Sequence, residues 1–310
     1  MVKKLKIFNN FNIPNKFKKS IILIGNFDGL HSGHQKLFEL AKKYKTKYKS
    51  KIGVVTFDPI PRMFFNTKIK NYRISNFNQK VVNLKKFGVD FLINKKFDKN
   101  FSKINYYKFI KNILSRKLRS KFIFVSNNFR FGNKREGNVD LLIKNEDKYN
   151  FKVVKPEPLI KQQKIISSTL IRGLLEKGYL EKANKLLNRK WTINGVVQKG
   201  RQVGKKIGFP TCNIDIKDYV LAKPGVYAVR VLVPNNSKYL KGIANLGYRP
   251  TFNQKKILLE VHLFNYSGNL YNKLLSVEFI KFIREEKKFK NVNQLKSQIK
   301  KDLNIAKKTK

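Results

Sequence analysis

The sequence has little cysteine, few acidic residues and no long apolar run. Its 310 residues include one cysteine, Cys212, so no disulfide can form within the chain and a reducing compartment is expected. The amino-terminal MVKKLKIFNN lacks the apolar core of a signal peptide. No segment approaches the ~20 apolar residues that span a bilayer. We therefore expect a soluble, cytoplasmic protein with no membrane partner.

Acidic residues are outnumbered by basic ones, with 19 Asp and Glu against 69 Lys and Arg and a formal net charge of +50. Such a charge is typical of proteins that bind nucleic acids or anionic membranes. Here the basic residues are spread over the whole chain and are mostly lysine, whereas base recognition prefers arginine. A bias of the whole composition, as in A+T-rich genomes, explains the charge better. We expect no specific nucleic-acid partner, although the positive field would attract phosphorylated ligands.

The first half of the chain alternates between short apolar runs and helical patterns. Strands are predicted at 21–24, 51–57, 89–93, 121–125 and 151–154, with helices after the first strand, at 76–87 and around 109–114. Strands that alternate with helices predict a parallel, doubly wound α/β sheet. Ligands of such sheets bind beyond the carboxyl ends of the strands.

In the second half the pattern changes. Two helices are predicted at 167–176 and 179–188, and from Trp191 to Phe282 the periodicity is mostly two, with turn residues and no helices between. This predicts a small antiparallel β-barrel. A closing helix is expected to face inward with Val292, Leu295, Ile299 and Leu303. The predicted domains are 1–188 and 189–310.

Two of the three histidines lie in the loop Gly25-Asn-Phe-Asp-Gly-Leu-His31-Ser-Gly-His34, between the first strand and its helix. A glycine-rich turn before a helix N-terminus is a common phosphate site. Two imidazole N–H donors beside that helix end can stabilise charge that develops on a phosphate. Incidental loop histidines and a metal site are the alternatives.

A second candidate phosphate element is Ser167-Ser168-Thr169-Leu-Ile-Arg172, at the start of a predicted helix. The hydroxyl residues predict an N-cap. The same hydroxyls and the free backbone N–H groups can also bind a phosphate, with Arg172 one turn further on.

A glycine-rich segment in the second half runs from Gly200 through Gly204-Lys205 to Pro210-Thr211-Cys-Asn213. It is not a Walker A loop, because the spacing is one residue short and no Ser or Thr follows the lysine. A mobile basic hairpin is one interpretation, and a nest of N–H groups that binds phosphate is the other. The oxygens of Thr211 and Asn213 suit a hard cation such as Mg²⁺.

Glu260 lies in the alternating segment 258–264. The alternation places Leu259, Val261 and Leu263 on one face, and Glu260 with His262 on the other. A solvated glutamate is the simplest interpretation. Beside a loop that binds Mg²⁺ and phosphate, Glu260 becomes a candidate general base.

The elements GNFDGLHSGH, TFDP, NNFRFG and ISSTLIR, in this order, resemble the FMN adenylyltransferase module of prokaryotic bifunctional riboflavin kinase/FAD synthetases. The resemblance implies a Rossmann-like nucleotidyltransferase domain. It implies an ATP site that includes Gly25, Phe27, Asp28, His31, Gly33, His34, Ser168, Thr169 and Arg172. It also implies a flavin site that includes Phe57, Asp58, Asn128 and Phe131. Two positions depart from the usual pattern: Ile60 replaces a histidine and Ser126 a glycine.

The second half resembles the riboflavin kinase barrel through GxxxGxxxGFPTxN, PGVY, LEVHLF and FIREEKKF. The resemblance implies that Gly200, Gly204 and Lys205 bind nucleotide and that Thr211 and Asn213 bind Mg²⁺ with ATP. It further implies Glu260 as catalytic base and Arg284 near the flavin. Lys205 stands where arginine is usual, which keeps the charge but loses bidentate geometry.

Together the two resemblances imply phosphorylation of riboflavin to FMN and adenylylation of FMN to FAD, at separate sites. Riboflavin, FMN and ATP are the expected substrates, and a monomer or weak homo-oligomer is expected. One alternative is a chain that kept a single activity, as the departures at Ile60 and Ser126 would suggest. The other is a basic nucleic-acid-binding protein built on a nucleotidyltransferase fold.

Overall fold

The computed structural model describes residues 5–161, 163–200, 204, 207–216, 218–234, 236–250 and 255–309. By their internal contacts the residues group into two compact units. One comprises Met1–Ile69 and Phe77–Ser167, and the other Lys70–Asn76 and Ser168–Lys310. Within the described ranges, no helix is long and apolar enough to cross a bilayer.

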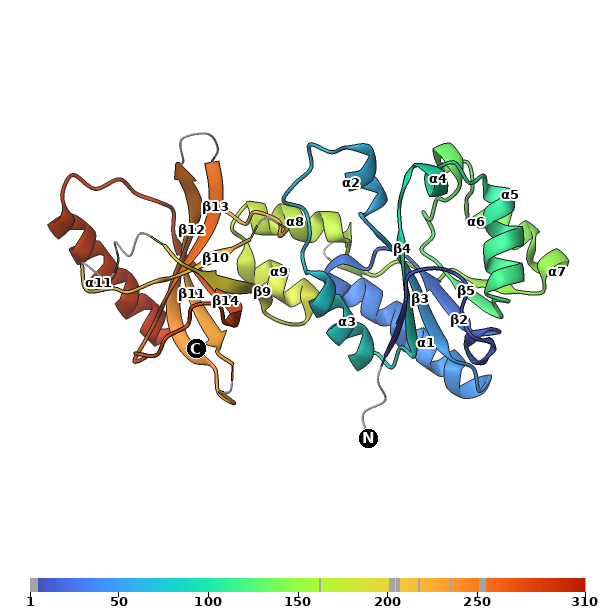
Figure 1. Cartoon of the computed structure of the whole chain (residues 1–310), viewed down its shortest axis with the longest axis horizontal. Helices are drawn as coiled ribbons and strands as arrows, with labels where there is room; N and C mark the ends of the chain where they lie inside the picture. The colour runs from blue at the N-terminus through green and yellow to red at the C-terminus, as the bar shows by residue number, and fades with distance from the viewer. Residues whose placement is uncertain are drawn as a thin grey trace. The chain divides into compact units, whose positions relative to one another are not determined.

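The first unit contains a parallel sheet, which has six strands among the described residues (Figure 1). Its order is β1-β4-β3-β2-β5-β6, with every neighbouring pair parallel. The strands are β1 (Lys6–Phe8), β2 (Ile21–Ile24), β3 (Ile52–Asp58), β4 (Phe91–Lys96), β5 (Phe122–Phe124) and β6 (Lys152–Val154). The five predicted strands are confirmed. Strand β1 was not predicted; it forms the edge beside β4 and is too short to show a periodicity.

Helices cover both faces of this sheet, which confirms the doubly wound prediction. Ile21 and Leu23 of β2 pack with α1 (Ser32–Lys47) and α3 (Phe77–Lys86), whereas Ile22 and Ile24 pack with η3 (Phe109–Lys117) and α6 (Val139–Lys144). The other short elements are η1 (Asn15–Phe17), η2 (Asp28–Leu30), α2 (Pro61–Phe65), α4 (Lys99–Ser102), α5 (Tyr106–Lys108), η4 (Asn133–Arg135), α7 (Glu146–Tyr149), β7 (Ile160–Lys161) and β8 (Lys164–Ile165).

Strand β2 is the point where the strand order of the sheet reverses. It pairs with β3, which follows it in the chain, on one side and with β5 on the other. Ligands of doubly wound sheets bind in the crevice at this switch point, beyond the carboxyl ends of the strands. The loop that carries both histidines leaves β2 at that end.

The second unit contains a closed antiparallel barrel, as predicted (Figure 1). Its order is β10-β13-β12-β11-β14-β9, and β9 pairs back with β10. The strands are β9 (Trp191–Gln198), β10 (Cys212–Asp215), β11 (Gly225–Leu232), β12 (Leu240–Pro250), β13 (Lys255–Leu263) and β14 (Leu274–Arg284). Trp191 is fully buried against Phe279, with the ring centroids 4.7 Å apart.

Helices α8 (Ser168–Glu176) and α9 (Leu180–Leu187) match the predicted helix pair and belong by contacts to the barrel unit. Asn184 of α9 joins two strands, because it donates to the Phe279 carbonyl at 3.1 Å and accepts from the Trp191 N–H at 2.6 Å.

The closing helix α11 (Val292–Lys308) packs on β11, β12 and β14. The prediction that Val292 faces inward was wrong, since this residue is 53% exposed. Leu295, Ile299 and Leu303 are half-buried, and the fully buried residues are Asp302 and Ala306. The inner face of the helix covers a cavity and an ion pair, so an apolar stripe does not extend to its first turn.

Candidate active sites

In the two-histidine loop, His31 is the N-cap of α1, and its Nδ1 accepts a hydrogen bond from the His34 backbone N–H at 3.4 Å. An accepting Nδ1 carries no proton, so the neutral His31 ring has its proton on Nε2. The two imidazoles stack with centroids 3.7 Å apart. His31 therefore offers an Nε2–H donor at the positive end of a helix of 16 residues.

His34 is held neutral. Its Nδ1 is buried and has no hydrogen-bond partner among the described residues. The pKa of His34 lies well below its ordinary value of 6.5, chiefly because burial disfavours the charged imidazole. Electrostatic interactions with His31 and Lys80 lower this pKa further. At neutral pH, His34 acts as a polar group that can donate one N–H.

The backbone of the two-histidine loop is strained at Phe27, before the two histidines. Phe27 is fully buried with φ 45° and ψ 40°, in the left-handed region that costs a non-glycine residue ~1–2 kcal/mol. Packing against His34 and Phe38, at 5.2 and 5.1 Å between centroids, stabilises this conformation. At Gly33, a Cβ would lie 3.2 Å from His31 Nδ1, so any side chain there would press on the imidazole.

The other predicted members of the loop support its shape. Gly25 donates its N–H to the Val55 carbonyl at 3.1 Å, which ties the start of the loop to β3. Asp28 is 3% exposed within η2. Both residues thus belong to the folded loop.

Ser168 and Thr169 form the first turn of α8, as predicted, with Thr169 exposed. Arg172 is buried, which was not predicted. Its Nε donates to the Tyr72 carbonyl at 2.7 Å, and its guanidinium lies 3.7 Å from the centre of the Tyr72 ring. Stacking on an aromatic ring fixes the plane of a guanidinium. No sequence pattern indicated Tyr72, which lies 100 positions from Arg172.

An aromatic cavity lies in the α/β unit. Two predicted flavin residues, Phe57 and Phe131, line it. Phe129 and Arg130 of the NNFRFG element line it as well, together with Phe65, Phe97, Phe101 and Phe109, which were not predicted. Asp58 and Asn128 are not among the lining residues. Asp58 ends β3, and the exposed Asn128 accepts a hydrogen bond from the Ser126 hydroxyl at 2.9 Å, so the unusual serine contacts a predicted site residue.

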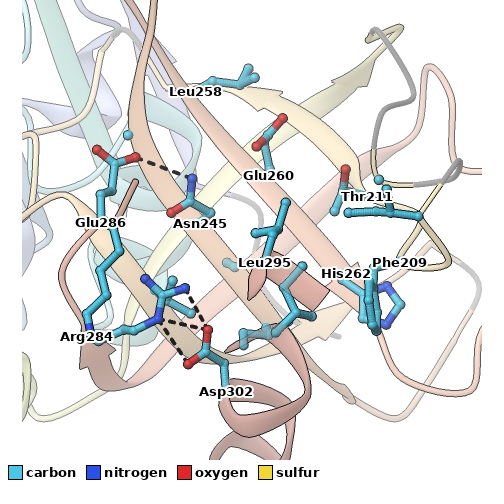
Figure 2. A pocket seen from close by; sticks show the side chains of 18 of the residues that line it. Phe209, Thr211, Asn245, Leu258, Glu260, His262, Arg284, Glu286, Leu295 and Asp302 are labelled. Atoms are coloured by element: carbon cyan, nitrogen blue, oxygen red, sulfur yellow. Dashed lines mark hydrogen bonds and ion pairs between the residues drawn. The ribbon is translucent and has the colours of Figure 1, made fainter. Parts of the chain in front are cut away.

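A cavity of about 520 Å³ opens in the barrel unit (Figure 2). Five predicted residues line it together: Gly204, Thr211, Asn213, Glu260 and Arg284. The register places Glu260 opposite Asn213 on β10 and opposite Asn245 on β12. Directly opposed residues of antiparallel strands point to the same side. Glu260 therefore lies in a row between two amides.

The predicted alternation of β13 is confirmed. Leu259, Val261 and Leu263 are buried in the barrel core, whereas Glu260 and His262 are half-buried and face the cavity. The ring nitrogen Nδ1 of His262 lies 2.7 Å from the Pro210 carbonyl oxygen, which ties β13 to the segment before Thr211.

The residues around Asn213 suit a cation with oxygen ligands. Asn213 is 7% exposed, and its Oδ1 has no hydrogen-bond partner in the described part of the chain. A Cβ at Gly200 would overlap the Asn213 amide, so a larger residue there would displace that side chain. The predicted phosphate ligand Lys205 lies outside the described residues. The described ranges contain no group of three His, Cys, Asp or Glu side chains that could hold a metal ion.

Arg284 is fixed by a carboxylate that the sequence analysis missed. Its Nε shares one N–H between the two Asp302 oxygens at 3.0 and 2.9 Å, and an NH₂ group donates to Oδ2 at 2.8 Å (Figure 2). Asn245 also faces the cavity and donates to Glu286 at 3.5 Å. Asn245 lies in the segment 242–252, which also resembles the riboflavin kinase barrel, but no role was predicted for it. No sequence signal pairs Arg284 with Asp302.

Comparisons with known proteins cover both units. The family model of FAD synthetase matches residues 13–170, and that of riboflavin kinase matches residues 187–310. A bifunctional riboflavin kinase/FMN adenylyltransferase of Buchnera aphidicola subsp. Schizaphis graminum is 42% identical over 302 residues, 96% of each chain. The Escherichia coli K12 protein of the same name is 36% identical and covers 91% of this chain and 90% of its own.

One solved structure is also similar over the whole length. The crystal structure of a macrolide-efflux protein from Streptococcus pneumoniae matches with a TM-score of 0.86 and 26% sequence identity. The match covers 99% of this chain and 100% of that chain. The order and folds of the two units are therefore shared with a solved structure.

Proposed function

This chain belongs to the family of bifunctional riboflavin kinase/FMN adenylyltransferases, and we infer that it catalyses both steps of FAD synthesis. It transfers the γ-phosphoryl group of ATP to riboflavin, which yields FMN and ADP. It then joins FMN to the adenylyl group of a second ATP, which yields FAD and pyrophosphate. The kinase step belongs to the barrel unit and the adenylyl step to the α/β unit.

The kinase assignment rests on one observation. Asn213, Glu260 and Asn245 lie in a row and line the same cavity. We propose that the Glu260 carboxylate accepts the proton of the terminal ribityl hydroxyl as its oxygen attacks the γ-phosphorus. The bond between that phosphorus and the β,γ-bridging oxygen breaks, and ADP leaves. The amides of Asn213 and Asn245 line the same cavity on either side of this carboxylate. Arg284, fixed by Asp302, lines the flavin side of the same cavity.

Enzymes of these two classes generally use a divalent metal, and we propose that Mg²⁺ binds with ATP at Thr211 and Asn213. The buried Asn213 Oδ1 without a partner and the close approach of Gly200 support this fit. A bound Mg²⁺ would neutralise charge on the phosphate oxygens. Gly204 lines the cavity beside Thr211, where its backbone can approach a phosphate.

For the adenylyl step, we propose that a phosphate oxygen of FMN attacks the α-phosphorus of ATP and that pyrophosphate leaves. The Nε2–H of His31 and the N–H of neutral His34 donate to phosphate oxygens on which charge develops. That Ser168, Thr169 and Arg172 bind further phosphate oxygens stays a prediction from the sequence, because contacts group these residues with the barrel unit. The aromatic cavity at Phe57 and Phe131 is proposed to hold the flavin ring.

The finer predictions from the sequence stay proposals. The domain boundary near 188 is supported by the start of the riboflavin kinase match at residue 187, although contacts group α8 and α9 with the barrel. A cytoplasmic location and a monomeric or weakly oligomeric state also stay predictions.

A crossed assay tests the assignment of the two sites. Wild type and the variants His31→Ala and Glu260→Gln receive ATP and Mg²⁺ with either riboflavin or FMN, and the flavins are separated by chromatography. We expect His31→Ala to form FMN but no FAD, and Glu260→Gln to form FAD when FMN is supplied but no FMN from riboflavin. Each variant is thus the folding control of the other.

Four results would contradict the proposal. Loss of both activities in both variants would exclude separate sites. FMN without FAD from the wild type would mean that the adenylyl activity has been lost, in line with the departures at Ile60 and Ser126. No FMN from the wild type would exclude the kinase assignment. A Glu260→Gln variant that retains normal FMN formation would exclude Glu260 as the base.

A further inference from the structure

Helix α3 turns one lysine toward the interior of the α/β unit. Lys80 is 3% exposed, and with Leu84 it makes up the fully buried positions of the helix. The two residues are four positions apart and so share one helix face. Lysine is rarely buried to this degree, because taking an ammonium out of water is costly. Lys85 and Lys86 of the same helix are exposed in the ordinary way.

The Lys80 ammonium lies at the carboxyl end of β3, next to the two-histidine loop. Its Nζ donates to the Thr56 hydroxyl at 3.2 Å, and Thr56 is fully buried. The Thr56 hydroxyl in turn donates to the Asn26 carbonyl at 3.4 Å, inside the loop that leads to the histidines. Helix α3 also packs against η2 of that loop. Lys80, Thr56 and Asn26 therefore form a chain from α3 through β3 to the loop.

Burial extends the electrostatic influence of this cation. At an effective dielectric constant of about 20, typical of protein sites, unit charges ~4 Å apart interact about four times more strongly than in water. The field of Lys80 acts on His34, where it contributes to the lowering of the pKa. The same positive field favours an anionic ligand at the loop.

We propose that Lys80 is a positioning residue of the adenylyl-transfer site, where its buried ammonium, through Thr56, holds the two-histidine loop in the arrangement that receives the ATP phosphates. This inference rests on the proposed function, in which His31 and His34 bind those phosphates. It adds a residue far from the loop in sequence and outside the motifs that carry the family resemblance.

A purely structural role makes a different prediction. Replacing the buried ammonium by the apolar side chain of methionine removes the cost of taking that charge out of water, so the fold is expected to persist. If Lys80 only fills space in the core, Lys80→Met would keep normal FAD formation. If it positions the loop, the fold persists while the adenylyl step suffers, because a displacement of ~1 Å at a reacting centre can cost about 10²-fold in rate.

The test uses the full chain with steady-state kinetics of FAD formation from FMN and ATP. We expect Lys80→Met to lower kcat/KM for ATP by about 10²-fold, mainly through kcat, with riboflavin kinase activity within twofold of wild type. Lys80→Arg keeps a cation and is expected to recover part of the loss. Lys85→Met is the matched control on the exposed face of the same helix and is expected to behave as wild type.

The outcomes separate this inference from the function on which it rests. Normal FAD kinetics in Lys80→Met, with FAD formation abolished in His31→Ala, would overturn the role of Lys80 alone. Normal FAD formation in His31→Ala would overturn the proposed ATP site itself. Should circular dichroism show that the α/β unit of Lys80→Met is unfolded, Thr56→Val decides: a reduced kcat supports the inference, and an unchanged kcat overturns it.

Discussion

Removing the carboxylate that holds Arg284 should destabilise the barrel unit strongly. The Asp302 side chain is 2% exposed, and it accepts from two N–H groups of Arg284 and from Gln298 Nε2 at 2.8 Å. Asp302→Asn keeps the shape but turns an amide NH₂ toward the guanidinium. Breaking a buried ion pair from one side costs ~3–5 kcal/mol. Because Arg284 is 16% exposed and retains a bond to the Glu285 carbonyl, we expect ~3 kcal/mol.

The chain provides a probe that is specific to this unit. Trp191 is the single tryptophan, and it is 1% exposed inside the barrel. Urea unfolding followed by its fluorescence reports on the barrel without a contribution from tryptophan elsewhere. With a denaturant slope of about 2 kcal/mol/M, a loss of ~3 kcal/mol lowers the midpoint by about 1.5 M.

A matched control lies on the same strand. Glu278 of β14 accepts a bond from Arg230 at 2.8 Å and another from the Tyr239 hydroxyl, and the Arg230 side chain is 42% exposed. Exposed pairs contribute ~0–1 kcal/mol, so Glu278→Gln should shift the midpoint by less than ~0.5 M. A shift for Asp302→Asn that is no larger than the shift for Glu278→Gln would refute the reasoning from burial.

Three other predictions follow from single sites. Burial raises the pKa of the Cys212 thiol to about 11. Ellman's reagent at pH 8 should therefore react far more slowly with Cys212 in the native chain than in the chain unfolded by urea. Equal reaction rates in the two states would contradict this prediction. NMR at pH 6.5 should find the His34 ring neutral, because its pKa in the folded chain is lowered. The stability that this shift contributes is present above pH 6.5 and is lost as the pH falls toward the folded pKa. A His34 ring that is half-protonated at pH 6.5 would contradict the prediction. Chelation by EDTA should abolish FMN formation and Mg²⁺ should restore it. The urea midpoint of the Trp191 signal should change little, because the described residues contain no group of three His, Cys, Asp or Glu side chains that could hold a structural metal ion. FMN formation that persists in EDTA would count against the Mg²⁺ proposal.

The fold was predictable from the sequence where one local pattern decides the structure. The run Ile21–Ile24 is buried on both faces of the sheet, so it reads as continuous apolar residues. Because successive side chains of a strand point to opposite faces of the sheet, the alternation in 258–264 predicted the face on which Glu260 lies. Both patterns are local, and neither depends on a partner far away in the sequence.

Features that depend on distant residues could not be predicted in this way. Arg172 and Tyr72 are 100 positions apart, and the three-residue strand β1 exists because β4 offers an open edge. The expectation for Val292 failed for a related reason. The pattern identified an amphipathic helix, but the helix faces a cavity near Leu295 and an ion pair at Asp302.

The role proposed for Lys80 also could not be predicted from the sequence. In a chain with 69 Lys and Arg, a composition bias explains any single lysine, so the sequence gives no reason to single this one out. Its position four residues before Leu84, on the apolar face of a predicted helix, was the available signal. Composition bias acts most freely at exposed positions, where a lysine costs little. At a position that is 3% exposed the same substitution is costly, so a retained charge there requires a specific compensation. Burial therefore distinguishes Lys80 from exposed lysines such as Lys85, and the kinetics of the two matched variants test that distinction directly.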